Sequence, residues 1–329
     1  MPRVTDELPL IGFGLPVSGA WATPATMVHV AQRAEELGYA SLWTFQRMLC
    51  LSPDEVDPAY DAAWNPATRA ADDAAYRAVH DPVVPLALVA GHTTTIGLGT
   101  ATICAPFVAP PLLAKTMTSL DHVSGGRLTV GVGIGWLPQE YVAAGIPFER
   151  RGARMEEYLR CLDALWTQDP VSFDGEFYTV PSSRTDLRPV QQPRPPVLVG
   201  GAAPAALRRA GRLAEGWISS TRQDPADIGR SVEHVREGAR TAGRDPDAVR
   251  VLTRVVVDLL DRDPGPQRRP FHGTREQVLD DIAALRGHGV TEVFVDLNFS
   301  PAVGSPEVAA AAAISEAERV LGALAPVRL

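Results

Sequence analysis

Three glycines at alternate positions carry the clearest chemical signal in this sequence. Gly131, Gly133 and Gly135 end an apolar run over residues 128–132 with the alternation of a buried β-strand, and Trp136 follows directly. Because side chains alternate between the two faces of a strand, these glycines leave one face bare. A bare face lets a flat or bulky group approach closely. The pattern indicates either a surface for a planar ligand or close packing against a neighbouring element.

Small residues also surround a second predicted turn. Four of them stand between an apolar run and Pro204, namely Gly200, Gly201, Ala202 and Ala203. Backbone N–H groups in such a turn, together with the N-terminus of the following helix, can bind an anion, and a phosphate is the one we expect. Ser219 and Ser220 end the next predicted strand and offer hydroxyls to the same anion. A tight strand-to-helix turn without any ligand uses the same residue types.

Other residues expected at strand ends offer little acid–base chemistry. Histidine and carboxylate are scarce there, and no convincing nucleophile and base stand together. Gln46, Arg47 and Trp136 are the candidate catalytic side chains, while Arg47 and Arg222 are candidate partners for negative charge. Since the protein supplies so few reactive groups, we expect a bound cofactor to carry out the difficult chemical step.

The composition narrows the class of protein. The chain has 329 residues and a net charge of −8, which indicates neither nucleic acid nor an anionic membrane surface as a partner. Its three cysteines (Cys50, Cys104 and Cys161) imply no disulfide framework, and the histidines show no spacing typical of a metal site. No signal peptide or membrane-spanning run is evident. We therefore expect a cytoplasmic protein without a metal.

Alternating strand and helix patterns predict the fold. The expected strands cover residues 10–16, 40–45, 95–103, 128–132, 196–199, 216–220, 249–260 and 289–296, and a predicted helix follows each. Eight such units favour a (β/α)8 TIM barrel in one domain over residues 1–329. An open doubly wound sheet is the rival fold, but Trp136 stands where a dinucleotide-binding motif has its third glycine.

Helix boundaries and insertions complete the predicted barrel. Thr23 and Gly38 should cap the first helix, and Thr274 with Gln277 should form a capping box on a later one. Insertions are expected at residues 46–79 and 169–195, after strands two and four. Residues 48–79 of the first, with Tyr60, Trp64 and Tyr76, are a candidate lid over the substrate or else a surface or dimer contact. The second should contain a hairpin that turns at Asp174-Gly175. Arg151, Arg154 and Glu157 fit ion pairs along a helix.

The stretch GVGIGWLPQEYVAAGIPFERRGARMEEYL resembles the signature of the luciferase-like flavin-dependent monooxygenase superfamily. More narrowly, it resembles the branch that uses the deazaflavin coenzyme F420. LGYASLW at residues 37–43, LDHVSGGRL at 120–128 and PPVLVGGAAPAALRRAGRLAEGWI at 195–218 extend the similarity over nearly the whole chain. The resemblance implies a TIM barrel that binds the deazaflavin at the C-terminal ends of its strands, and a homodimer.

The resemblance also assigns roles to particular residues. It implies that the cofactor ring lies against Ala101 and Thr102, where family members often have a cis peptide in a backbone bulge. It further implies a phosphate site at residues 200–203, a hydroxyl contact from Ser220, and loop contacts beside the ring from Trp136 and Gln139. Adding Arg222 as a charged partner, the predicted cofactor-binding residues are Ala101, Thr102, Gln139, Gly200, Gly201, Ala202, Ala203, Ser220 and Arg222.

Two departures from the family pattern shape the functional expectation. Dehydrogenases of the F420 branch carry an acidic residue and a histidine where this chain has Gln46 and Arg47. Members that use FMN often have asparagine in place of Leu137 and tyrosine in place of Gly152, so the chain favours the deazaflavin. We expect an F420-dependent oxidoreductase that transfers a hydride to or from a small organic substrate. The alternatives are an FMN-dependent two-component monooxygenase and a barrel that binds a flavin or deazaflavin without catalysis.

Overall fold

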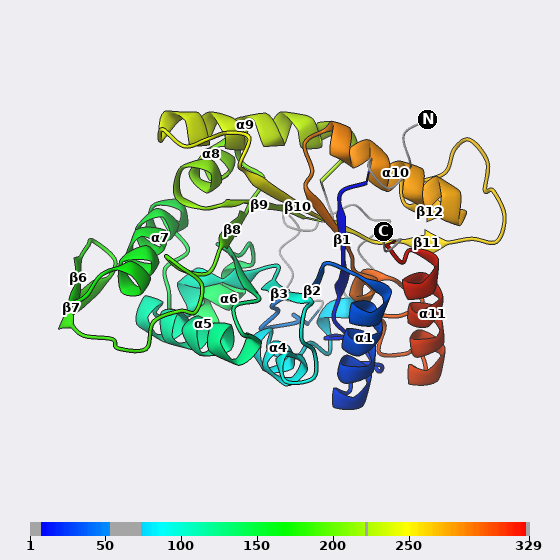
Figure 1. Ribbon diagram of the computed structural model, residues 1–329, viewed down its shortest axis with the longest axis horizontal. Helices are drawn as coiled ribbons and strands as arrows, with labels where there is room; N and C mark the ends of the chain where they lie inside the picture. Colours follow the sequence, from blue (N-terminus) through cyan, green and yellow to red (C-terminus); the bar gives the residue numbers. More distant parts are fainter. Residues whose placement is uncertain (1–7, 53–73, 221–222, 327–329) are drawn as a thin grey trace.

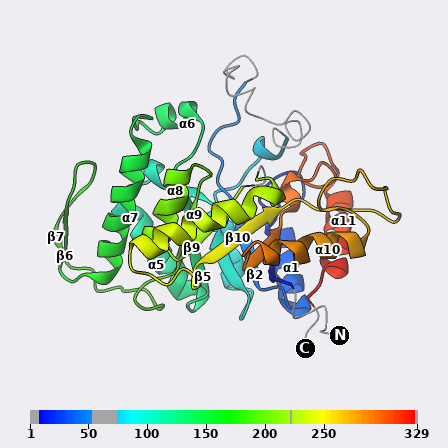
Figure 2. The same cartoon turned by 90° about the horizontal axis from the view of Figure 1, so that it is seen from above.

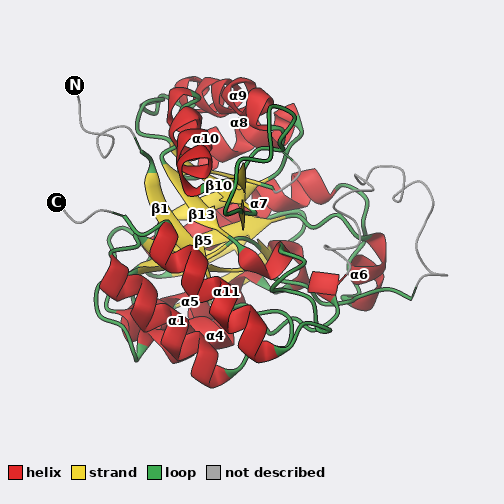
Figure 3. Ribbon diagram, turned by 90° about the vertical axis from the view of Figure 1, so that its right-hand side faces the viewer, coloured by secondary structure: helices red, strands yellow, loops and turns green. Residues whose placement is uncertain are grey.

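A closed barrel of parallel β-strands forms the centre of the molecule, as predicted (Figure 3). The computed structural model describes residues 8–52, 74–220 and 223–326. The barrel strands there are β1 (Leu10–Gly14), β2 (Ser41–Thr44), β3 (Gly97–Thr100) with its continuation β4 (Ile103–Cys104), β5 (Leu128–Gly133), β8 (Val197–Gly200), β9 (Gly216–Ser219), β10 (Arg250–Val255) and β13 (Glu292–Val295). Pairing of β1 with β13 and of β3 and β4 with β5 closes a ring of eight strands.

Helices enclose the barrel on its outer side (Figures 1 and 2). They are α1 (Pro24–Leu37), α4 (Val83–Ala90), α5 (Pro110–Ser124), α6 (Pro138–Ala143), α7 (Arg151–Thr167), α8 (Pro204–Leu213), α9 (Ile228–Thr241), α10 (Arg275–Gly287) and α11 (Ala310–Ala323). Short 3-10 turns occur at η3 (Ala105–Phe107), η4 (Pro225–Asp227) and η5 (Leu297–Phe299). No helix among these residues is long and apolar enough to cross a membrane.

The predicted helix caps are confirmed. The Thr23 side chain accepts a hydrogen bond from the Thr26 N–H at the start of α1, and Gly38 ends that helix with φ of 85°. Only glycine adopts this left-handed conformation without strain. Thr274 and Gln277 form the reciprocal capping box at the start of α10. These local signals place the helices, and so the strand ends between them, where the sequence indicates.

The hairpin after α7 turns differently from the prediction. Strands β6 (Val171–Asp174) and β7 (Thr179–Ser183) pair, but a four-residue loop joins them, so the turn predicted at Asp174-Gly175 is wrong. The reason lies on α7, where the Glu157 carboxylate accepts hydrogen bonds from the N–H groups of Glu176, Phe177 and Tyr178 at 2.7–3.0 Å. These three bonds hold a wider loop than a two-residue turn.

The ion pairs predicted along α7 are also wrong. Glu157 is engaged by the hairpin loop, whereas the guanidinium of Arg154 lies 4.6 Å from the centre of the Phe177 ring. Arg151 stacks on Phe148 at 3.9 Å. Within the first insertion, Tyr60 and Trp64 lie outside the described residues, so the candidate lid stays a prediction.

Side chains fill the lower part of the barrel. Glu292 accepts hydrogen bonds from Ser41 and from the Trp43 indole N–H near the N-terminal ends of the strands. Above this layer a buried apolar cluster crosses the lumen, consisting of Trp43, Ala101, Leu198, Ile218, Leu252 and Phe294. Space inside the barrel is therefore left at the C-terminal ends of the strands, where barrel enzymes place their active sites.

Candidate active site

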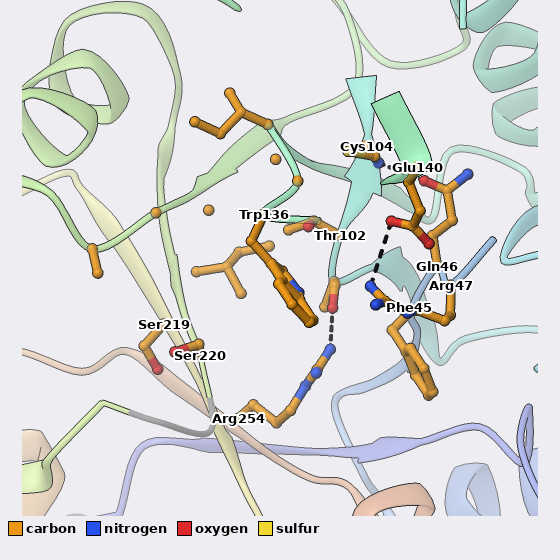
Figure 4. Close-up of a pocket in the computed structure, with 18 of the residues that line it drawn as sticks. Phe45, Gln46, Arg47, Thr102, Cys104, Trp136, Glu140, Ser219, Ser220 and Arg254 are labelled. Carbon is orange, nitrogen blue, oxygen red and sulfur yellow. Dashed lines mark hydrogen bonds and ion pairs between the residues drawn. The ribbon is translucent and has the colours of Figure 1, made fainter. Parts of the chain in front are cut away.

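A cavity of about 400 Å³ opens at the C-terminal ends of the strands (Figure 4). Its walls come from the segment after β2, the β3–β4 junction, the end of β5 with α6, the β8 turn, β9 and β10. The lining residues are Phe45, Gln46, Arg47, Met48, Tyr76, Ala101, Thr102, Cys104, Phe107, Gly133, Ile134, Gly135, Trp136, Glu140, Gly200, Gly201, Ala202, Ile218, Ser219, Ser220, Gln223 and Arg254. The volume and the mostly apolar lining suit a planar organic ligand.

The junction between β3 and β4 forms one wall. The peptide bond between Ala101 and Thr102 is cis, as the family resemblance implies. Glycines face Thr102 from two neighbouring strands. A Cβ on Gly133 would lie 2.7 Å from the Thr102 hydroxyl, and one on Gly200 would lie 3.2 Å from its methyl group. The glycines therefore let the Thr102 side chain pack closely against β5 and β8, and a larger residue at either position would displace it.

Gln46 is held to this same wall. Its side-chain oxygen accepts a 2.7 Å hydrogen bond from the backbone N–H of Cys104 on β4. This contact gives Gln46 a positioning role that the sequence did not indicate. Burial raises the pKa of the Cys104 thiol, and the nearby Glu140 carboxylate raises it further, so the thiol stays neutral rather than acting as a nucleophile.

Arg47 and Glu140 form a buried ion pair beside Trp136. The Arg47 guanidinium lies 3.4 Å from the carboxylate, and each side chain is less than a tenth exposed. The same guanidinium lies 4.5 Å from the Tyr76 ring centre and 4.6 Å from the Trp136 ring centre. The other oxygen of Glu140 accepts the N–H groups of Met48 and Leu49. The pair thus connects the segment after β2 to helix α6.

Arg254 extends into the cavity from strand β10. One of its terminal nitrogens donates a hydrogen bond to the carbonyl oxygen of Ala101 (Figure 4). Its Nε lies 3.3 Å from Asp296, an ion pair without hydrogen-bond alignment. Burial raises the pKa of the Asp296 carboxyl group, while the Arg254 charge and two hydrogen bonds from Asn298 oppose that rise.

The predicted phosphate turn lies at the end of β8. Gly201 has φ of 144°, and a Cβ there would lie 2.8 Å from the Ala206 side chain, so the turn needs glycine. The carbonyl of Gly201 accepts the Trp217 indole N–H at 2.7 Å, which fixes the turn to β9. Helix α8 begins directly afterwards with Pro204 in its first turn.

Two serines border this turn, Ser219 at the end of β9 and Ser220 directly after it. The Ser219 hydroxyl is buried and has no hydrogen-bond partner, whereas Ser220 is exposed to the cavity. An unpartnered buried hydroxyl beside a strand-to-helix turn is suited to a ligand oxygen.

Most of the residues predicted for the site come together in this cavity. Ala203 and Gln139 belong to the adjoining turn and helix but are not among the lining residues, and Arg222 lies outside the described residues. The sequence interpretation missed Arg254 and Glu140, and it gave Asp296, at a predicted strand end, no role. One usable signal existed, because Arg254 stands inside the mostly apolar run over residues 251–257, and a charged residue in such a run is seldom buried without a partner. Among the described residues, no group of His, Cys, Asp and Glu side chains could hold a metal ion.

Several known proteins are similar to this chain. The family described as luciferase-like monooxygenase matches residues 12–264. An uncharacterised protein of Mycobacterium tuberculosis is 39% identical over 193 residues, which are 58% of this chain and 67% of that protein. The F420-dependent glucose-6-phosphate dehydrogenase of Amycolatopsis mediterranei is 27% identical over 287 residues, or 86% of this chain and 78% of that enzyme.

Two further comparisons concern the cofactor and the fold. The FMNH2-dependent dimethylsulfone monooxygenase of Pseudomonas putida is 34% identical over 138 residues, or 41% of this chain and 38% of that enzyme. The coenzyme F420-dependent tetrahydromethanopterin reductase of Methanopyrus kandleri has the same fold, with a TM-score of 0.71 at 19% identity over 97% of this chain and 98% of the other. Relatives thus include proteins named for each of the two cofactors.

Proposed function

The chain belongs to the luciferase-like monooxygenase family, and on that premise we propose that it transfers a hydride between the deazaflavin coenzyme F420 and a small organic substrate. Family membership makes it an oxidoreductase that depends on a flavin or a deazaflavin. The choice of F420 and the hydride transfer are the proposal.

The observation that supports this proposal most is that the cavity is lined by small residues and has few reactive side chains. Glycine, alanine and threonine make the wall on the β3, β5 and β8 side, while the described lining residues include no histidine, and the Cys104 thiol among them stays neutral. Glu140 and Gln46 are both engaged in contacts within the protein. A site with room for a planar ring and few reactive side chains suits a cofactor that supplies the redox chemistry.

The residues present fit such a cofactor. The wall at Ala101, Thr102, Gly133 and Gly200 would hold the ring, because a Cβ at either glycine would push the Thr102 side chain out of its place in that wall. The turn at residues 200–203 and the N-terminus of α8 would hold the phosphate, with the unpartnered Ser219 hydroxyl and Ser220 beside them. When bound, the deazaflavin accepts or donates a hydride at C5. The cavity residues would orient the ring and exclude water from one side of it, and Trp136 would lie beside the substrate.

Three observations favour F420 over FMN. The F420-dependent relative matches 86% of this chain, compared with 41% for the FMNH2-dependent relative. Leu137, which is buried, and Gly152 stand where FMN-dependent members often have asparagine and tyrosine. The space beside Gly152 is taken by the Arg209 guanidinium, 3.2 Å from where a Cβ would lie.

A two-component monooxygenase that uses reduced FMN is the second candidate. The 34% identity to the dimethylsulfone monooxygenase, higher than that to the F420-dependent relative, supports it. A barrel that binds either cofactor without catalysis is the third candidate.

Titration of the purified protein with F420 and with FMN, each oxidised and reduced, tests the proposal. We expect F420 to bind more tightly, and the bound deazaflavin to be reduced or oxidised by a member of a panel of alcohols, aldehydes and unsaturated carbonyl compounds. Preference for reduced FMN with oxygen uptake would establish the second candidate. Binding without turnover of any compound would leave the third. A folded protein that binds neither cofactor would overturn all three.

We also propose that the protein is a homodimer, on the family resemblance alone. Light scattering coupled to size-exclusion chromatography measures its mass directly. A monomer at micromolar concentration would contradict this.

A further inference from the structure

Arg254 places a charged group between the floor of the cavity and the cis peptide. Its side chain is 11% exposed, and its guanidinium carbon lies 5.0–5.5 Å from the ring centres of Phe45, Phe294 and Phe299. The hydrogen bond to the Ala101 carbonyl brings the charge to the wall where the cofactor ring is proposed to lie. Aromatic packing on the other sides prevents the side chain from swinging away.

The charges around Arg254 leave it only partly neutralised. Asp296, directly after β13, is the nearby carboxylate, but two hydrogen bonds from Asn298 engage its other oxygen, and its contact with Arg254 lacks hydrogen-bond alignment. The remaining charged residues that line the cavity, Arg47 and Glu140, pair with each other. Of these four groups, Arg254 is therefore the one whose positive charge is directed at a ligand on the Ala101 side.

A second arginine on the same strand offers an internal comparison. Arg250 lies four residues earlier on β10 and pairs with Glu292 at 3.4 Å, much as Arg254 pairs with Asp296 at 3.3 Å. It is absent from the cavity lining, and at the rise of a β-strand it lies about 13 Å from Arg254. Arg250 thus has a similar partner and strand but no access to the ligand.

We propose that Arg254 stabilises the reduced, negatively charged form of the cofactor and so sets the reduction potential of the bound ring. The inference rests on the proposed function. A hydride brings two electrons and one proton to the ring, and its departure takes them away, so the reduced ring carries one more negative charge than the oxidised ring. A fixed cation at close range in a poorly solvated site lowers the energy of that form.

The test compares the dissociation constants of oxidised and reduced cofactor, using whichever of F420 and FMN the wild-type protein binds. Arg254→Met should weaken binding of the reduced form about tenfold more than that of the oxidised form, which corresponds to a midpoint potential lower by about 30 mV for a two-electron couple. Asp296→Asn should shift the ratio of the oxidised and reduced dissociation constants in the opposite direction, because it leaves the Arg254 charge less compensated. Arg254→Lys should retain most of the effect.

Two further variants guard against misinterpretation. Arg254→Met leaves the Asp296 carboxylate buried without its partner, so the pair Arg254→Met/Asp296→Asn repeats the measurement without a buried charge. Arg250→Met removes the same charge from the far end of β10 and should leave the ratio unchanged.

The outcomes separate this inference from the proposed function. Wild-type protein that binds neither cofactor overturns both together. If the cofactor binds but the ratio of its two dissociation constants is unchanged in Arg254→Met and in Arg254→Met/Asp296→Asn, the inference is wrong and the proposed function stands. Equal weakening of the two redox forms also overturns the inference, because that result indicates a purely structural role. Opposite shifts for Arg254→Met and Asp296→Asn support it.

Discussion

The carboxylate of Glu140 lies 3.4 Å from the guanidinium of Arg47, across the wall of the cavity. The two residues come from different βα segments, one following β2 and the other on α6 after β5. Trp136 and Tyr76 flank the guanidinium with their rings. This pair connects the segment after β2 to helix α6, and its guanidinium packs against Trp136 in the cavity wall.

Removal of one partner from this pair should be costly. Glu140→Gln keeps an acceptor for the loop N–H groups but leaves the Arg47 charge buried without its counter-ion, so we expect the free energy of unfolding to fall by about 3 kcal/mol. The double variant Arg47→Met/Glu140→Gln should recover part of that loss. Urea unfolding measures both. If the double variant loses as much free energy of unfolding as Glu140→Gln and Arg47→Met lose when their separate losses are added, the two side chains are not coupled.

Gln46 should behave as a positioning residue rather than as a proton donor. Gln46→Met removes the acceptor for the Cys104 N–H, which costs about 1–3 kcal/mol when the donor is left buried. We expect lower stability and weaker cofactor binding together, measured by thermal unfolding and fluorescence titration. Gln32→Met is the matched control, since the Gln32 side chain is exposed and bonds only to the His92 carbonyl at 3.2 Å. Full stability with lost turnover in Gln46→Met would instead favour direct catalysis.

Gly200 should control access of the cofactor to the cavity. Gly200→Val introduces methyl groups where a Cβ alone lies 3.2 Å from Thr102, and overpacking of this kind costs about 1–3 kcal/mol. We expect cofactor affinity to fall at least about tenfold, as measured by titration. Gly322→Val, in α11 where an added side chain meets nothing within 4 Å, should leave affinity unchanged. Unaltered binding in Gly200→Val would place the cofactor elsewhere.

Glu35 should contribute pH-dependent stability on the opposite side of the fold from the cavity. Burial alone would raise the pKa of Glu35, but hydrogen bonds from the N–H groups of Thr94, Thr95 and Ile96 and from the Thr95 hydroxyl outweigh it, so its pKa lies below the ordinary value. Because the folded-state pKa is depressed, the stabilisation is complete above the unfolded-state pKa. It is lost as the pH falls through the folded-state pKa.

Glu35→Gln tests this expectation. We expect a loss of about 1 kcal/mol at pH 7, a modest value because the side chain is partly exposed. The difference from wild type should shrink as the pH is lowered below about 4, where the wild-type carboxylate also becomes protonated. Chemical unfolding at a series of pH values measures both curves. A difference independent of pH would show that the charge of Glu35 is not responsible.

Much of the barrel could be predicted because its signals are local. The alternation over residues 128–132 predicted β5, and the caps at Thr23 and Gly38 predicted the ends of α1. Both depend on neighbours within a few positions of the chain. The hairpin turn was wrong because its conformation depends on Glu157, which lies on another element and supplies hydrogen bonds that no local pattern reveals.

By itself, the sequence determined the order of strands and helices, the glycine-lined wall of the cavity and the small-residue turn before α8. Each of these follows from backbone geometry and side-chain size over a short stretch. Only the tertiary structure decided which charges meet there. Arg254 and the Ala101 carbonyl are 153 residues apart in the chain, and Arg47 and Glu140 are 93 apart. Closure of the barrel brings them within hydrogen-bonding or ion-pairing distance, because it joins strand ends that the chain itself holds far apart.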